Sequence, residues 1–311
     1  MAKPKFDTHQ DVTDAIVARL EQGTKPWAPD WQGAALTMPR RITGEQYQGI
    51  NVVLLWMAAQ ERGFAGHTWM TFRQALELGG AVRKGEKGTR ICFFKKLTVK
   101  DRDAAPDSDE TKQIPMLRTY TVFNVDQIDD LPEKYRLQNV QPLPGIERDS
   151  DREAALRATG ADIREGGTRA FYQPTADFVQ MPDFERFTSA SGFLATLAHE
   201  LVHWTGHKSR LDRFGPNTRT GYAFEELVAE LGAAMVGARL GIVGEHIDNH
   251  AAYIASWAKA LKDDKRAIFK AATLAQKAAD LVLANAGTAT TGRGDEREPA
   301  PIAAEQFALA L

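Results

Sequence analysis

Cysteine is almost absent from this sequence, and long apolar runs are absent altogether. Cys92 is the only cysteine in 311 residues, so no disulfide can form within the chain, which favours a reducing compartment. The longest apolar run, Val52 to Ala59, is far shorter than the roughly 20 residues of a membrane-spanning helix. The N-terminus is polar and charged and lacks the apolar stretch of a secretory signal. We therefore expect a cytoplasmic protein without a membrane partner.

Charge is nearly balanced over the whole chain, with a net value of -2, but it is not evenly distributed. The first 100 residues contain 15 Lys and Arg against nine Asp and Glu, whereas the remainder contains 24 against 32. A positive excess suits a nucleic-acid partner, so such binding is expected in the N-terminal part. With 43% hydrophobic residues, the chain can form roughly two domains of ordinary size.

A His-Glu-x-x-His motif, formed by His199, Glu200 and His203, lies within an apolar stretch of helical period. Residues four apart on a helix share one face, about 6 Å apart along the axis, so two imidazoles can bind one metal ion. Glu200 is placed to act as the general base towards a water on that metal. This is the arrangement of a zinc metallohydrolase, with Zn²⁺ or another divalent ion such as Mn²⁺ as the cofactor.

A third ligand is expected on a second predicted helix around residues 221–232. Glu226 and Glu230 lie four residues apart on this mostly apolar segment, and a cation would explain why carboxylates are placed there. We expect Glu226 to bind the metal and Glu230 to accept the outer N–H of a ligand histidine. Glu225 points about 100° away from Glu226 and is expected at the surface.

His207 is the alternative third ligand, because it follows His203 by four residues. Gly206, however, is expected to end the helix just before it. The metzincin pattern would also require a histidine two residues further on, where this chain has Ser209. We therefore rank His207 below Glu226.

Turn-forming residues divide the chain into two folded parts. Residues 1–130 are predicted to be α+β, with a buried helix capped by Asn51 and a strand pair at 91–94 and 117–125. A Pro-punctuated linker is expected at 131–148. Residues 149–286 are predicted to be mainly helical with a small β-sheet formed by strands at 169–172 and 178–181. The tail, 287–311, has the composition of a disordered segment.

The N-terminal part combines tryptophans with a basic, glycine-containing turn. Single-stranded nucleic acid is bound by stacking of bases on aromatic rings and by cations along the backbone. Trp27 and Trp31 could provide the stacking rings, whereas Trp56 is expected in the core. The phosphate contacts are expected from the cations of the turn, which are Arg83, Lys84, Lys87 and Arg90.

Several segments together resemble a known family. Residues 47–51, 69–75 and 82–89 look like the N-terminal domain of ArdC-type antirestriction proteins, which is similar to the N-terminal part of plasmid primase-like proteins. Residues 199–207 and 225–231 look like the metallopeptidase-like domain of the same family. The resemblance covers most of residues 8–285. It implies an N-terminal domain that binds single-stranded DNA and a C-terminal zincin-like metallopeptidase domain. It further implies that His199, His203 and Glu226 bind the metal and that Glu200 has the catalytic role.

The main functional hypothesis is therefore an antirestriction protein that protects incoming plasmid DNA from host restriction endonucleases. Two alternatives remain open at this point. The chain could be an intracellular zinc metallopeptidase whose N-terminal module recognises protein. It could also be a pure single-stranded DNA-binding protein in which the metal site only stabilises the fold. A restriction endonuclease is a further expected partner under the main hypothesis.

Overall fold

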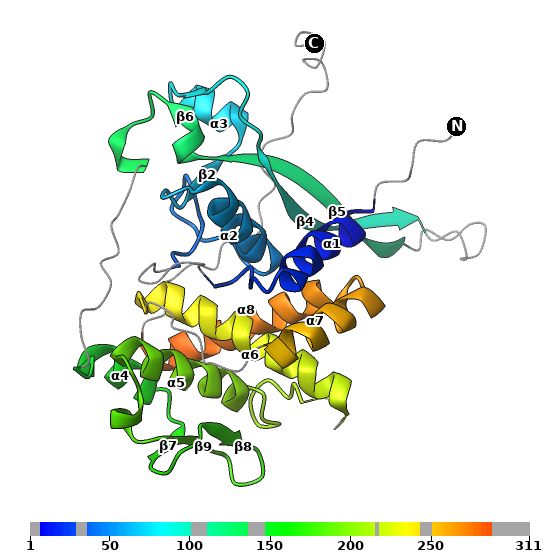
Figure 1. Cartoon of the computed structure of the whole chain (residues 1–311). Coiled ribbons are helices and arrows are strands. Elements are labelled where there is room, and N and C mark those ends of the chain that lie inside the picture. Colours follow the sequence, from blue (N-terminus) through cyan, green and yellow to red (C-terminus); the bar gives the residue numbers. More distant parts are fainter. Residues whose placement is uncertain are drawn as a thin grey trace.

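The computed structural model describes residues 7–28, 36–100, 111–135, 147–214, 218–242 and 251–287. The fold is mixed α and β, with a β-rich N-terminal half and a mainly helical C-terminal half that carries a small sheet, as predicted (Figure 1). The expected tail beyond Gly287 lies outside the described residues. The helices are α1 Thr8–Glu21, α2 Ile50–Arg62, α3 Phe72–Glu77, α4 Ser150–Arg157, α5 Ala190–Thr205, α6 Arg219–Leu240, α7 Ala251–Asp263 and α8 Ala267–Asn285. The strands are β1 Arg40–Arg41, β2 Thr68–Met70, β3 Ala81–Val82, β4 Thr89–Lys100, β5 Thr111–Asn124, β6 Ile128–Asp129, β7 Asp162–Glu165, β8 Phe171–Gln173 and β9 Phe178–Met181.

The N-terminal sheet has the strand order β1-β2-β5-β4, and helix α2 packs against β4. The predicted strand pair is present as β4 and β5, which pair antiparallel from Thr89↔Val122 to Lys100↔Thr111. The expected helix cap at Asn51 is wrong, because α2 begins one residue earlier, after Gly49. The Asn51 side chain instead hydrogen-bonds both the N–H and the C=O of Cys92, at 2.7 Å each. Asn51 therefore joins α2 to the outer edge of β4.

A second small cluster closes the N-terminal half around α3. Thr71 caps α3 with a full capping box, in which Gln74 bonds back to the Thr71 N–H at 2.9 Å. The two-stranded ribbon β3–β6 lies beside this helix, and Leu131 is buried against Ile128. The folded N-terminal half thus extends to the start of the segment expected to be a linker.

The C-terminal half is built on α5, α6 and α8, which pack against one another. A three-stranded sheet of order β7-β9-β8 lies against α5 through β8 and β9 (Figure 1). Strand β7 was not predicted, because its sequence, Asp-Ile-Arg-Glu, contains a single apolar residue and shows no alternation. It pairs parallel with β9, which supplies the apolar face.

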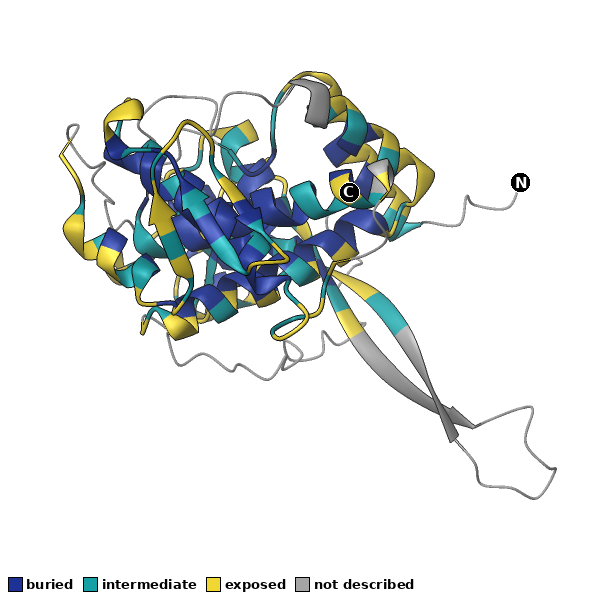
Figure 2. Cartoon of the chain, turned by 90° about the horizontal axis from the view of Figure 1, so that it is seen from below, coloured by how far each residue is buried: buried dark blue, intermediate teal, exposed yellow. Residues whose placement is uncertain are grey.

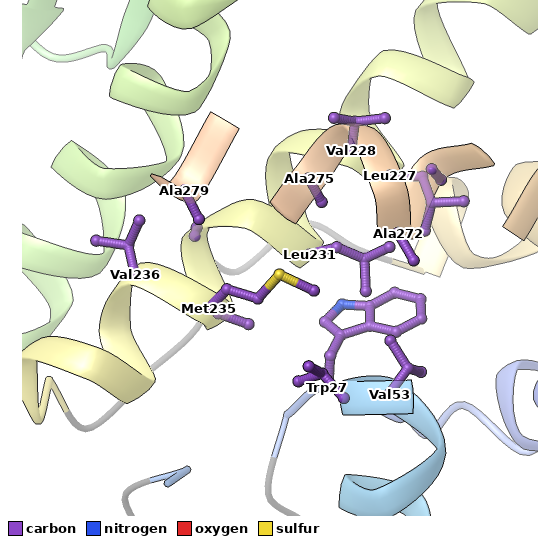
Figure 3. Packing of buried hydrophobic residues seen from close by; sticks show 14 of the residues in the cluster. Trp27, Val53, Leu227, Val228, Leu231, Met235, Val236, Ala272, Ala275 and Ala279 are labelled. Atoms are coloured by element: carbon purple, nitrogen blue, oxygen red, sulfur yellow. The ribbon is translucent and has the colours of Figure 1, made fainter. Parts of the chain in front are cut away.

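One hydrophobic core runs through both halves. Trp27, fully buried, lies beside Leu231 and Met235 of α6 and Val53 of α2 (Figure 3). Helix α1 packs against α7, and buried residues form a continuous interior in the view from below (Figure 2). The two predicted domains therefore share their core. Among the described residues no helix is both long and apolar enough to cross a membrane.

Candidate metal centre

Helix α5 carries His199, Glu200 and His203, and local sequence sets both of its ends. Ser189 caps the N-terminus by accepting a hydrogen bond from the Gly192 N–H at 3.0 Å. Gly206 is the C-terminal cap, so the predicted end of the helix before His207 is confirmed. The two histidines lie one turn apart, with ring centroids separated by 4.8 Å.

Helix α6 carries Glu226 and crosses close to α5. Thr218 caps its N-terminus by accepting a hydrogen bond from the Gly221 N–H at 3.0 Å. Gly232 lies against α5, where an added Cβ would be 2.9 Å from both methyl carbons of Val202. Since that distance is shorter than Cβ contacts in proteins, the close approach of the helices requires glycine there. This approach brings Glu226 to the histidines.

The three sequence-predicted ligands converge. His199 Nε2 and His203 Nε2 are 3.2 Å apart, and the Glu226 carboxylate oxygens lie 3.7 Å from the first and 3.5 Å from the second. Ligand atoms arranged tetrahedrally at about 2.0–2.1 Å from a zinc ion are separated by about 3.3 Å. Two imidazoles and one carboxylate at these distances fit a divalent metal with a fourth position left open.

The electrostatics of this cluster favour a cation between the three side chains. Burial alone would lower the pKa of His203, but its hydrogen bonds with Glu225 and Glu226 and the nearby carboxylate charges raise that pKa to about 10. Burial would likewise raise the pKa of Glu226, but the two histidines hold it well below its usual range. Positive charge is therefore strongly stabilised at this position.

Glu225 is not at the surface, which corrects the expectation for this residue. Its carboxylate lies 3.1 Å from His203 Nδ1 and pairs with Arg213 at 2.7 Å, and its side chain is only 14% exposed. Arg213 also donates to the Val202 C=O at the end of α5, at 2.7 Å. Glu225 therefore holds the outer nitrogen of His203. No sequence pattern indicated this pair, because Arg213 lies in an irregular segment twelve residues away.

Glu230 faces the outer nitrogen of His199 but does not accept the expected hydrogen bond from it, and its carboxylate has a partner that was not foreseen. Its Oε1 is 3.8 Å from His199 Nδ1, too far for a hydrogen bond, while its Oε2 pairs with Lys25 Nζ at 3.2 Å. Burial lowers the pKa of Lys25, and the charge of Glu230 opposes that shift. An N-terminal residue thus reaches the surroundings of the histidines.

Glu200 and His207 occupy different environments. Glu200 is 6% exposed, and within the described part of the chain its carboxylate has neither a hydrogen bond nor an ion pair. Its negative charge is close enough to raise the pKa of His203. His207 lies outside the cluster of His199, His203 and Glu226, and its Nδ1 is 2.8 Å from Ser209 Oγ.

All four cations of the basic turn between β3 and β4 are exposed, and one of them also stabilises the turn. Arg83 pairs with Glu86 at 3.0 Å and with Asp129 at 3.4 Å, so it fixes the turn. Lys84, Lys87 and Arg90 are exposed. These three cations are accessible to phosphates.

Trp27 cannot stack on bases, which corrects the expectation for this residue. Its indole is 0% exposed and lies 5.8 Å from the ring of Trp257. Burying this large ring against α6 and α7 stabilises the fold, although the polar residues next to it in the sequence had suggested exposure. Trp31, the other predicted stacking residue, lies outside the described residues.

A different aromatic group is exposed beside the basic turn. Phe72 and Leu76, one turn apart on α3, are 51% and 55% exposed. The Phe72 ring packs edge-on against Phe123 at 6.2 Å. Gly88 of the turn approaches the Phe123 ring so closely that an added Cβ would lie 3.1 Å from its tip. The sequence shows the apolar pair on α3, but not that it faces solvent.

Comparison with known proteins assigns both halves. Residues 6–123 match the family model of the N-terminal domain of anti-restriction factor ArdC, and residues 150–274 match that of a zincin-like metallopeptidase. The antirestriction ArdC protein from plasmid R388 is 51% identical in sequence to this chain, and its metal-free crystal structure superposes with a TM-score of 0.81. The match covers 92% of this chain and all of that one. The chain belongs to the ArdC antirestriction family.

Other relatives of this ArdC-family chain are a metal-bound crystal structure, a protein of similar length and a much longer primase. The Mn(II)-bound crystal structure of the R388 protein matches 90% of the chain and 98% of its own, at 51% identity and a TM-score of 0.77. A Sinorhizobium fredii (strain NGR234) protein named uncharacterized protein y4eC is 41% identical over 88% of this chain and 91% of its own length. DNA primase TraC from Escherichia coli is 40% identical over 91% of this chain, but the match covers only 28% of the primase. Priming activity is therefore not inferred from that relative.

Proposed function

We propose that this ArdC-family chain binds single-stranded DNA through its N-terminal half and protects incoming plasmid DNA from host restriction. His199, His203 and Glu226 hold a divalent metal, Zn²⁺ or Mn²⁺, and Glu200 is the general base of a hydrolytic site. The observation that supports this proposal best is the convergence of the three side chains: the two histidine Nε2 atoms are 3.2 Å apart, and the two Glu226 oxygens lie 3.7 Å and 3.5 Å from them.

Each neighbouring side chain has a distinct role in the proposed site. When bound, the metal supplies Lewis acidity towards a carbonyl group and a water. Glu225, held by Arg213, fixes the orientation of His203 through its outer nitrogen. The buried carboxylate of Glu200 takes the proton of the attacking water. Strand β8 lies at an edge of its sheet, where an extended polypeptide could pair along the backbone.

The first test replaces the proposed base. We expect Glu200→Gln to retain bound metal and DNA binding but to lose protection of transferred plasmid DNA, since general-base catalysis contributes about 10²–10⁴-fold. Metal content would be measured by mass spectrometry and protection by transfer into a restricting host. Glu185→Gln, at an exposed glutamate, is the matched control. Full protection by Glu200→Gln would instead support a structural metal and a pure DNA-binding role.

On the DNA side, we propose that Phe72 and Phe123 provide the stacking surface, that Leu76 adds an apolar contact beside them, and that Lys84, Lys87 and Arg90 contact phosphates. The rings of Phe72 and Phe123 are contiguous with the basic turn, because Phe123 contacts Phe72 on one side and lies against Gly88 of the turn on the other. No base-reading element is evident on this surface among the described residues, so the binding is expected to be independent of sequence. An aromatic face next to exposed cations suits single strands better than duplex.

The second test measures binding of a single-stranded oligonucleotide as salt is raised. Phe72→Ala should weaken binding by about 1–3 kcal/mol at every salt concentration, because one stacked base loses its ring. Lys84→Gln with Lys87→Gln should weaken binding and flatten the salt slope by about 0.7 for each phosphate that is no longer neutralised. Phe171→Ala, at an exposed aromatic of β8, is the control and should bind as the wild type does. Undetectable or salt-insensitive binding by the wild-type protein would remove the DNA half of the proposal and favour an N-terminal module that recognises protein.

A further inference from the structure

The loop between α1 and the N-terminal sheet inserts two side chains next to helix α6. Trp27 packs beside Leu231 (Figure 3), and Lys25 pairs with the adjacent residue, Glu230. The side chains of this ion pair are nearly inaccessible, at 9% exposed for Lys25 and 3% for Glu230. A buried pair of this kind requires both charges, because either one alone would be desolvated without compensation.

The charges around the histidines show what Lys25 contributes. Among the described residues, four carboxylates contact or face His199 and His203, and two cations, Arg213 and Lys25, compensate two of them. The remaining deficit of two positive charges equals the charge of one divalent ion. The four carboxylates belong to Glu200, Glu225, Glu226 and Glu230.

The position of Glu230 shows how Lys25 acts on His199. Its two oxygens point to different partners, and the one facing His199 Nδ1 stops at 3.8 Å, beyond hydrogen-bond distance. The other oxygen is within 3.2 Å of Lys25 Nζ. Lys25 therefore competes with His199 for this carboxylate.

We propose that Lys25 is a positioning residue that weakens the metal centre by holding Glu230 away from His199. This inference rests on the proposed metal site. Without the lysine, Glu230 can approach the outer N–H of His199, which makes the imidazole a stronger ligand and adds one uncompensated negative charge. The N-terminal half thereby sets the metal affinity of the C-terminal half, through a side chain that belongs to neither of the two ligand-bearing helices.

The test measures Mn²⁺ binding to the full chain by calorimetry after removal of metal with a chelator. We expect Lys25→Met to tighten the dissociation constant by about tenfold and Glu230→Gln to weaken it by a similar factor, the usual range for groups that orient metal ligands. Lys25→Arg keeps the positive charge and should bind Mn²⁺ with the wild-type affinity. In the Glu230→Gln background, Lys25→Met should have no further effect, because the carboxylate it acts through is gone.

The outcomes separate this inference from the metal site itself. If the wild type binds Mn²⁺ but Lys25→Met leaves the affinity unchanged or weaker, or acts equally with and without Glu230, then Lys25 has only a structural role and the inference is overturned. If the wild type binds no metal, the proposed function fails first. Should Lys25→Met not fold without metal, Lys25→Gln is measured in its place, because it keeps a polar group in the buried site but removes the charge. It is expected to tighten binding in the same direction, since the negative charge of Glu230 is then uncompensated.

Discussion

In the metal-free protein, the protonated imidazole of His203 supplies the positive charge that a metal ion would otherwise supply. His203 has its pKa raised from 6.5 to about 10, so it carries a proton at neutral pH and stabilises the carboxylates around it. That stabilisation is fully present below pH 6.5 and is lost as the pH rises towards 10. The lowered pKa of Glu226 adds a second contribution, present above pH 4.5 and lost as the pH falls through its depressed value.

This linkage predicts how metal binding depends on pH. Since a histidine ligand must be neutral, each bound ion should displace one proton from His203, and the apparent affinity should tighten about tenfold per pH unit between about pH 6 and 8. Mn²⁺ titrations in buffers of different ionisation enthalpy would report the proton directly. His207→Asn is the control, because His207 lies outside the cluster and should leave the proton release unchanged. An affinity that stays flat over this pH range would contradict the assignment.

At the same scale, the sequence was sufficient to predict which three side chains converge but not what surrounds them. Helical spacing was sufficient to place His199 and His203 on one face, and burial of an acidic pair on an apolar helix pointed to Glu226. Lys25 and Arg213 were missed because each reaches the site from an irregular segment, where no periodicity fixes the direction of a side chain. Trp27 was assigned wrongly for the same reason: polar and proline neighbours in the chain say little about what packs on a ring in space.

At the scale of elements, the crossing of α5 and α6 depends on a glycine. Gly232→Ala would place a methyl 2.9 Å from the side chain of Val202, and the helices must separate to admit it. We expect a loss of about 1–3 kcal/mol in the free energy of unfolding, together with weaker metal binding, because Glu226 moves with α6. Urea denaturation of the metal-free and Mn²⁺-loaded protein would measure both effects.

The same helix provides the control. At Gly237 an added Cβ would meet nothing closer than 3.5 Å, an ordinary contact. Gly237→Ala should therefore be neutral or stabilise the protein by up to about 1 kcal/mol through helix propensity alone. Equal losses for both substitutions would show that the close crossing with α5 is not the reason why Gly232→Ala destabilises the protein.

The elements themselves were predictable where one local rule applied. The capping box at Thr71 and the end of α5 at Gly206 follow from short-range hydrogen bonding, which the sequence displays. Strand β7 was missed because its pairing with β9, and not its own pattern, makes it a strand. At Asn51 two uses of the side chain compete, and the long-range contact with Cys92 prevails over the cap.

At the scale of the whole molecule, the two family matches do not correspond to two separate cores. Helix α1 and the loop that carries Trp27 belong to the N-terminal match, yet they pack on α6 and α7. Composition and linker signals predict a boundary in the chain, but they cannot predict that the two halves pack together, because the faces that pack across the boundary are apolar in the same way as any core. We therefore expect the protein to unfold as one unit.

Trp27→Ala tests this cooperativity. Removing a fully buried indole costs about 3–5 kcal/mol, and in a shared core the loss must appear in both halves. Hydrogen exchange in β4–β5 and in α5 should become faster by the same factor, with a single transition in urea. Phe72→Ala, at a half-exposed ring, should change stability by less than about 0.5 kcal/mol, and so separates a DNA contact from a core contact. Two transitions, with only the C-terminal one shifted by Trp27→Ala, would show instead that the halves fold independently and that the N-terminal loop is merely docked.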